Sequence, residues 1–348
     1  MADTGIAARK SAIYLLDQVL GEGRLMSELS AAGALDRLMP EDRARAARLS
    51  QDTLRGLERA DRLLQKHLKK NPPLTVRNAL RVGTVELCAG EAAHGVVNAM
   101  VEIVSRHRRY GHLKGLTNAV LRKVADEGPE AWDKLRAPRL PKWLRSPLVA
   151  AWGAEAVLGM ERAHFEGAPL DLTAKSDASH VASITGGRML PTGSVRVEKA
   201  VQVSAMPGFV DGDWWVQDAA AALPVRVLSP QHGETILDLC AAPGGKTLQL
   251  AAAGAQVTAV DDSKQRMKRV EENLLRTGLQ ANLIVDDARN ISGVFDAILL
   301  DAPCSATGTI RRHPELPFAK DGSEFAALID LQAHLIDYAW SLLKPNGR

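Results

Sequence analysis

The sequence has few cysteines and no long apolar run. Its three cysteines, Cys88, Cys240 and Cys304, are odd in number and widely spaced. This excludes a disulfide framework, and no Cys/His spacing is typical of zinc. No stretch approaches the roughly 18 apolar residues that a membrane span needs, and the first residues lack the basic and apolar regions of a signal peptide. We therefore expect a cytoplasmic protein with no metal and no membrane partner.

The chain of 348 residues is too long for one ordinary domain, so two or three are expected. The net charge of +3 is unevenly placed, because residues 1–134 hold 22 Lys and Arg against 17 Asp and Glu. A basic first part suits a phosphate-rich partner such as RNA, although a solvated helical surface has the same composition.

Hydrophobic periodicity divides the chain into three parts. Residues 1–135 show apolar positions at helical spacing and no alternating pattern, which predicts an all-α bundle. Residues 136–217 are predicted to form a linker and a small α+β domain with short strands. Residues 218–348 are predicted to form a third, α/β domain. The linker is indicated by clustered prolines at positions 129, 138, 141 and 147.

The α/β part alternates apolar strands with amphipathic helices. Such alternation predicts a parallel, doubly wound, Rossmann-like sheet, in which ligands bind outside the carboxyl ends of the strands. The expected strands cover residues 235–240, 256–261, 281–285 and 295–301.

A turn of small residues follows the first of these strands, in Asp238-Leu-Cys-Ala-Ala-Pro-Gly-Gly-Lys-Thr247. Small residues allow a ligand close to the backbone, and the following helix offers free N–H groups. A phosphate-binding P-loop matches only its end, Gly245-Lys-Thr. Cys240 replaces the first glycine of that motif, and Pro243 removes an N–H that a phosphate would use. A P-loop NTPase is therefore the weaker alternative.

Aspartates stand at the ends of the other three strands. Asp261 ends the second, Asp287 follows the third and Asp301 ends the fourth. Each has a structural reading, because Asp is common at strand ends and in turns. Together at one edge they favour a cofactor with a nucleoside, whose ribose a carboxylate can bind. The turn lacks G-x-G-x-x-G, which favours S-adenosylmethionine over NAD.

A second motif, Asp301-Ala-Pro-Cys-Ser-Ala-Thr-Gly308, places the thiol of Cys304 just after a strand. A thiolate is a strong nucleophile when nearby positive charge lowers its pKa. Arg311 and Arg312, with His313, could supply that charge or hold RNA phosphate. A buried, inert cysteine is the alternative reading; it suits Cys88 better than Cys304.

The two motifs strongly resemble the Sun/Nop2 (Fmu, RsmB-like) family of RNA 5-methylcytosine methyltransferases. The first part, with Asn78-Ala-Leu-Arg-Val-Gly-Thr-Val-Glu-Leu87 and Gly115-Leu-Thr-Asn-Ala-Val-Leu-Arg-Lys123, is similar to the NusB-type RNA-binding domain. The resemblance implies a NusB-like bundle, an α+β middle domain and a class I methyltransferase domain. It also implies action on a cytosine of small-subunit (16S) ribosomal RNA. We expect the protein to be a monomer.

The resemblance further implies roles for individual residues. Asp261, Asp287 and Asp301 would contact S-adenosylmethionine. In the family mechanism a cysteine attacks C6 of an unstacked cytosine, C5 takes the methyl group, and elimination releases the enzyme. Cys304 would assist that release. The loop residues expected to line the cofactor are Cys240, Ala241, Ala242, Pro243, Gly244, Gly245 and Lys246.

The sequence departs from the family at its end. The family nucleophile lies in Thr-Cys-Ser on a fifth strand, after a Lys-Pro-x-Gly turn, and this chain stops at that turn, Lys344-Pro-Asn-Gly347. The fourth strand would then have an unpaired edge. We therefore expect a fragment, truncated after the fourth strand, that binds cofactor poorly and does not turn over. If the chain is complete, Cys304 is the only plausible nucleophile.

Two questions remain open from the sequence. The chain could be an RNA-binding or assembly protein that has lost catalysis, and the helical part could be a purely structural or dimerising module. Arg108 and Arg109 lie in a basic cluster with an aromatic, Arg106-His-Arg-Arg-Tyr110, and we expect this cluster to contact RNA phosphates.

Overall fold

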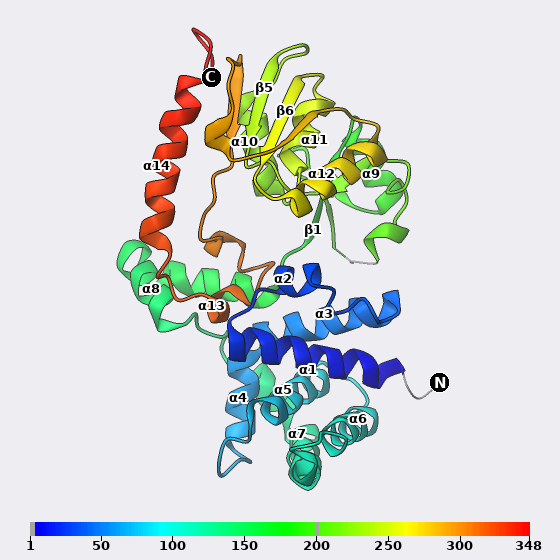
Figure 1. The fold of residues 1–348 in the computed structure, drawn as a ribbon. Coiled ribbons are helices and arrows are strands. Elements are labelled where there is room, and N and C mark those ends of the chain that lie inside the picture. Colours follow the sequence, from blue (N-terminus) through cyan, green and yellow to red (C-terminus); the bar gives the residue numbers. More distant parts are fainter. Residues whose placement is uncertain (1–3, 199–201) are drawn as a thin grey trace. The chain divides into compact units, whose positions relative to one another are not determined.

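The computed structural model describes residues 4–198 and 202–348 (Figure 1). Residues 1–3 and 199–201 lie outside the described part. The first three belong to the start of the chain, where no signal peptide is expected. Contacts group the chain into two units. The first holds the residues up to Ala168 together with Ala306–Ser323, and the second holds Pro169–Ser305 and Glu324–Arg348. The predicted three-domain boundaries at 135/136 and 217/218 stay predictions.

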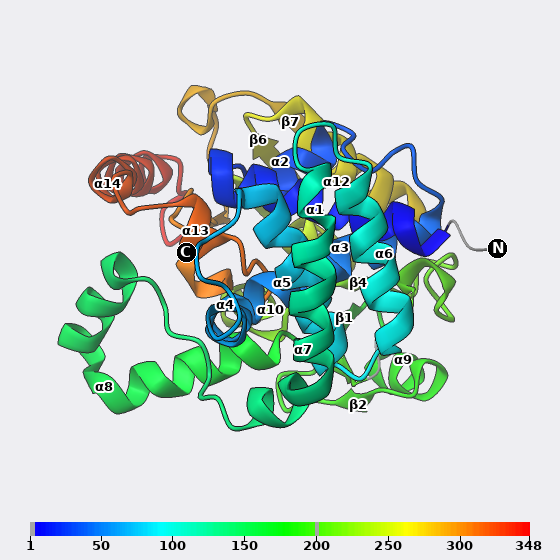
Figure 2. The ribbon, with the colours of Figure 1, turned by 90° about the horizontal axis from the view of Figure 1, so that it is seen from below.

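The first unit consists of packed helices, so the predicted all-α bundle is confirmed (Figure 2). Helix α2, the short helix α13 and the start of α1 were not among the helices expected from the sequence. The helices are α1 (Thr4–Glu22), α2 (Met26–Ala31), α3 (Pro40–Arg55), α4 (Leu57–Gln65), α5 (Leu74–Cys88), α6 (Ala93–Ser105), α7 (Lys114–Asp133), α8 (Lys142–Glu166) and α13 (Leu316–Ala319).

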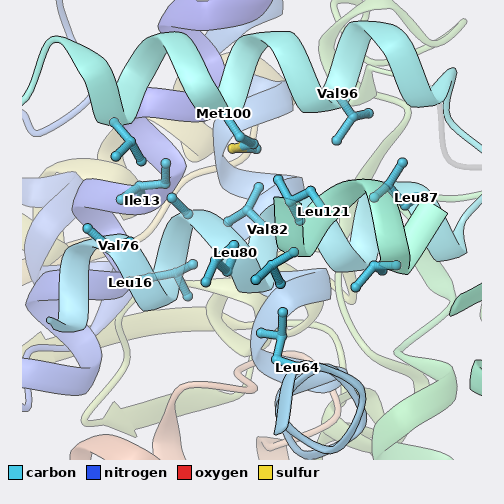
Figure 3. Packing of buried hydrophobic residues seen from close by; sticks show 14 of the residues in the cluster. Ile13, Leu16, Leu64, Val76, Leu80, Val82, Leu87, Val96, Met100 and Leu121 are labelled. Atoms are coloured by element: carbon cyan, nitrogen blue, oxygen red, sulfur yellow. The ribbon is translucent and has the colours of Figure 1, made fainter. Parts of the chain in front are cut away.

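Helix α5 is the centre of this bundle. Every residue from Asn78 to Leu87 is buried, as expected for a helix surrounded by others. Its apolar side chains meet those of α1, α4, α6 and α7 in one core, where Leu80 and Met100 are fully buried (Figure 3). The bundle therefore owes its stability to burial on all sides of one helix.

Two charged side chains of α5, Arg81 and Glu86, are buried and paired. Glu86, 3% exposed, accepts hydrogen bonds from Arg9 Nε and Nη2 at 2.7 and 2.9 Å. Arg81 donates to both carboxylate oxygens of Asp61, each at 2.7 Å. Because an unpaired buried charge is costly, these pairs fix the partners of α5.

The proline-rich linker predicted around residues 128–147 is shorter in the structure. Pro129 lies inside α7 and Pro147 inside α8, while Pro138 and Pro141 lie in the connection between the two helices. Helix α8 is interrupted at Gly153, whose φ of 81° is not helical. The linker prediction is therefore wrong at its two ends, where helices accommodate the proline.

A four-stranded antiparallel sheet begins the second unit, in the order β2-β3-β1-β4. Helix α9 (Ala178–Thr185) covers one face, where Trp214 is fully buried. Trp215, next along the strand, points to the other face and packs against Leu248 and Met267. Both faces of the sheet are thus in contact with protein. The strands are β1 (Leu170–Ala174), β2 (Arg188–Met189), β3 (Val195–Val197) and β4 (Trp214–Val216).

The predicted parallel sheet is confirmed, with the strand order β7-β6-β5-β8. Helix α14 (Phe325–Ser341) covers one face, and α10 (Ala219–Leu228) and α11 (Gly245–Ala252) cover the other, which is the doubly wound arrangement. Helix α12 (Lys264–Thr277) follows β6. The strands are β5 (Thr235–Leu239), β6 (Gln256–Asp261), β7 (Asn282–Val285) and β8 (Ala297–Leu300).

The outer edge of β8 was expected to be unpaired. Instead, the N–H of Ile298 donates to the carbonyl of Arg348 at 2.9 Å, and Phe295 forms a parallel bridge with Leu343. The expectation is therefore wrong at Ile298. Within residues 4–198 and 202–348, no helix has the length and apolar character that crossing a bilayer requires.

Candidate functional site

A cleft of about 560 Å³ lies at the carboxyl ends of the parallel strands. Residues at the end of each strand, or directly after it, contribute to the lining, as expected for a doubly wound fold. The structure therefore brings together side chains that are up to 95 positions apart in the sequence, from Cys240 to Leu335. The predicted residues that line the cleft are Cys240, Ala242, Asp261, Asp287, Asp301 and Cys304.

The small-residue turn between β5 and α11 is held against the end of β6. Ala241 N donates to Val260 O at 2.9 Å, and Ala242 N donates to Asp261 Oδ2 at 3.1 Å. Gly244 has a φ of 97°, and a Cβ on it would lie 2.9 Å from a methyl group of Val270. Only glycine fits this position without strain. Of the expected loop residues, Ala241, Pro243, Gly244, Gly245 and Lys246 are not in the cleft lining.

Asp261 is buried and well bonded. It is 2% exposed, and its carboxylate accepts from Ala242 N, from Ser263 N at 3.0 Å and from Arg266 Nη2 at 3.0 Å. A carboxylate offers about four acceptor positions, so three donors leave roughly one for a ligand. Asp261 thus shapes the turn and can still receive a hydroxyl.

The other two strand-end aspartates are more exposed and each has a basic partner. Arg289 donates to Asp287 from Nη2 at 2.5 Å, and this bond lowers the pKa of Asp287 to about 2. Lys246 Nζ lies 2.5 Å from Asp301 Oδ2. Lys246 therefore reaches the strand-end carboxylate from the turn, although it does not line the cleft.

Asp238, the first residue of the turn motif, was given no role from the sequence. It is fully buried, and Thr247 Oγ1 donates to its Oδ2 at 2.6 Å. Burial raises the pKa of this carboxyl to about 7, against the hydrogen bond from Thr247, which lowers it. In the sequence, the only sign that Asp238 could matter is its place as the first residue of the turn motif. Arg266 and Arg289 also line the cleft and were missed.

The three cysteines lie in different surroundings. Burial raises the pKa of Cys88 to about 12 and that of Cys240 to about 11. Cys304 is exposed at the cleft, and the preceding carbonyl, of Pro303, accepts from Gln332 Nε2 of α14 at 2.7 Å. Cys304 is thus the most accessible of the three thiols.

The basic residues predicted to meet RNA lie in the first unit. Arg108 and Arg109 are exposed, and Arg109 lies 5.7 Å from the ring centroid of Tyr110, which stacks on His107 at 4.7 Å. Arg312 is exposed too, whereas Arg311 is half-buried and donates from Nε to Gly167 O at 2.6 Å. Contact of these arginines with RNA stays a prediction.

Comparison with known proteins gives concordant matches. A family model described as 16S rRNA methyltransferase RsmB/F matches residues 225–348, and one described as the NusB family matches residues 6–126. The chain is 35% identical to ribosomal RNA small subunit methyltransferase B of Sodalis glossinidius, over 98% of this chain and 83% of that protein. The protein of the same name from Vibrio cholerae is 36% identical, with the same coverage.

Solved structures agree on the fold. The crystal structure of the protein PH0851 superposes with a TM-score of 0.75, covering 99% of this chain and 84% of that one, at 23% identity. The structure of NSun6 from Pyrococcus horikoshii superposes with a TM-score of 0.53 over 61% of this chain and 82% of that one, at 20% identity. At these identities the likeness shows the fold alone.

Proposed function

This chain belongs to the family of the 16S ribosomal RNA methyltransferases B and F, and on that premise we propose that it methylates C5 of a cytosine in small-subunit ribosomal RNA, with S-adenosylmethionine as methyl donor. The observation that carries the proposal is the cleft, where strand-end carboxylates, a turn of small residues and an exposed thiol meet. A ribosomal RNA substrate implies work in the cytoplasm.

The charge of the cleft supports this cofactor over a nucleoside triphosphate. Its lining contains five aspartates, at positions 261, 262, 286, 287 and 301, and two arginines, Arg266 and Arg289. S-adenosylmethionine supplies a methyl group on a positively charged sulfur, which an acidic site favours. A triphosphate carries several negative charges, which the same aspartates would repel. The P-loop reading is weaker for this reason as well as for its missing glycine.

We assign the cofactor contacts by the acceptors that remain available. Asp261 retains roughly one acceptor position for a ribose hydroxyl. Asp287, at the end of β7, is ionised at neutral pH and can accept from an adenine amino group. Asp301, paired with Lys246, lies nearest in sequence to the thiol and would face the methyl-donating end.

Cys304 is proposed to contact the target base, because it is the exposed thiol of the cleft. By the family mechanism it would assist release of the methylated base from a covalent adduct at C6. The alternative is that Cys304 itself attacks C6. A loop thiol at the rim of the cleft suits either role, since a base flipped out of its stack enters from the open side.

The helical unit is proposed to hold the RNA. Arg108 and Arg109 offer two exposed guanidinium groups beside the stacked pair of His107 and Tyr110. Guanidinium groups bind phosphates, and aromatic rings stack on unpaired bases. This pairing of chemistries is typical of a single-stranded RNA contact.

Deletion of the encoding gene tests the proposed function without requiring a purified enzyme. We expect one 5-methylcytosine to disappear from small-subunit ribosomal RNA, mapped by bisulfite sequencing, and to return when the intact gene is restored. An unchanged methylation map would contradict the proposal. If purified chain nevertheless binds that RNA, an assembly role without catalysis would be favoured.

A further inference from the structure

The segment Ala306–Ser323 belongs by its contacts to the helical unit, although the residues on both sides of it belong to the unit with the sheets. It begins two residues after Cys304. The chain therefore leaves the cleft at the thiol loop, enters the helical bundle, and returns at Glu324 just before α14 begins.

Apolar side chains embed this segment in the bundle. Ile310 and Leu316 are 4% and 5% exposed, and they share a cluster with Leu140 and Leu144 from the start of α8 and the connection before it. Burial of this extent is typical of a core and not of a surface loop. The segment is thus a structural part of the helical unit.

Hydrogen bonds also attach the segment Ala306–Ser323 to the rest of the helical unit. Arg311 Nε donates to Gly167 O at 2.6 Å, and Arg55 Nη2 of α3 donates to Arg311 O at 3.4 Å. Further along, Trp143 Nε1 of α8 donates to Pro317 O at 3.2 Å. Arg311 is therefore held both by its side chain and by its backbone.

The span between the thiol and this anchor is short. Five residues separate Cys304 from Ile310, and three of them, Thr307–Thr309, form a 3-10 turn. Thr309 closes that turn, with its N–H and its hydroxyl both donating to Ala306 O at 2.8 Å. On the other side of the thiol, Gln332 holds Pro303. The hydrogen bonds that close the turn reduce the freedom of its backbone.

We propose that Ile310 and Arg311 are positioning residues, which restrict the loop of Cys304 by anchoring it in the helical unit. The anchored segment follows Cys304 closely in the chain, so its anchoring limits the local motion of the thiol loop. The relevance to methyl transfer rests on the proposed function; the anchor itself does not.

The test measures the mobility of the loop in the whole chain, without RNA or cofactor. A nitroxide label is attached to Cys304, the exposed thiol. Replacing Arg311 by Ala should narrow the electron paramagnetic resonance lines of the label. It should also speed hydrogen exchange of the amides of residues 307–312 about tenfold, the effect of one lost hydrogen bond on a local opening. Ile310→Ala should act in the same direction.

Asp321→Ala is the matched control, because that carboxylate bonds to Ser323 N within the same segment. It should change neither measurement at residues 304–312, and Arg311→Lys should restore part of the exchange protection. Unchanged label mobility and unchanged exchange in Arg311→Ala, with native circular dichroism, would overturn the proposal. So would equal effects from Asp321→Ala. Neither result depends on whether the protein methylates RNA.

Discussion

Replacement of Asp238 by Asn should change how the stability of the sheet unit depends on pH. The carboxyl is fully buried beneath the small-residue turn, and burial raises its pKa from 3.8 to about 7. In the unfolded chain it ionises near pH 4, whereas in the folded chain it keeps its proton up to about pH 7. Folded protein therefore holds more protons in this window, and its stability falls as the pH rises through it.

The size of this effect follows from the difference between the two pKa values. About three pKa units at 1.36 kcal/mol each amount to roughly 4 kcal/mol. The free energy of unfolding should fall by this amount between about pH 4 and pH 7, and the contribution of Asp238 should not change further above that range. Asparagine does not titrate, so Asp238→Asn lacks this loss. It should match the wild type near pH 4 and exceed it by up to roughly 4 kcal/mol at pH 8.

Urea unfolding at half-unit steps from pH 4 to pH 8 measures this difference, with hydrogen exchange of the β5 amides reporting on the unit that contains Asp238. Subtracting the free energies of unfolding of the two proteins at each pH removes the contribution of every other titrating group. Thr247→Val is a useful companion, because it removes the hydrogen bond that lowers the pKa of Asp238 and should enlarge the loss. A difference that stays constant across the range would refute the reasoning.

Three further predictions concern other parts of the chain. Glu86→Gln should destabilise the bundle by about 3–5 kcal/mol in urea unfolding, because it leaves the buried charge of Arg9 without its partner; a loss below about 1 kcal/mol would contradict this. Reversing the charge of Arg108 and Arg109 to Glu should weaken RNA binding and flatten the slope of log K against log salt by roughly 1.4 or more; an unchanged affinity would rule out the contact. Iodoacetamide at pH 8 should modify Cys304 well before the other two cysteines, whose pKa values are about 11 and 12; equal rates by peptide mass spectrometry would show that burial does not protect them.

The parallel sheet could be predicted from sequence because its signals are local. Apolar strands ending in Asp261 or Asp301, with amphipathic helices between them, specify the same edge for each strand end. The cleft then followed from topology alone. The carboxylates meet there although the second and fourth strand ends are 40 positions apart in the sequence.

Other features depend on contacts that no local pattern encodes. Pro147 predicts a linker by composition, yet it lies inside α8, a helix whose Leu144 is buried in a cluster with Leu140 and Ile310. Ile310 packs in the helical unit through a long-range contact, because Leu140, in the same cluster, lies 170 positions earlier in the sequence. No local sequence pattern predicts such a contact. From the sequence, Asp238 is an ordinary strand residue, because nothing local predicts that its carboxyl is fully buried with a raised pKa.

Thermal unfolding of the purified chain with millimolar S-adenosylmethionine, and separately with ATP and magnesium, is the most direct measurement of what the cleft binds. We expect S-adenosylmethionine to stabilise the chain, by about 1.4 kcal/mol at ten times its dissociation constant. Asp261→Asn should weaken that effect, because the cleft loses the carboxylate assigned to the ribose. Stabilisation by ATP and magnesium, with none by S-adenosylmethionine at any concentration, would contradict the methyltransferase assignment.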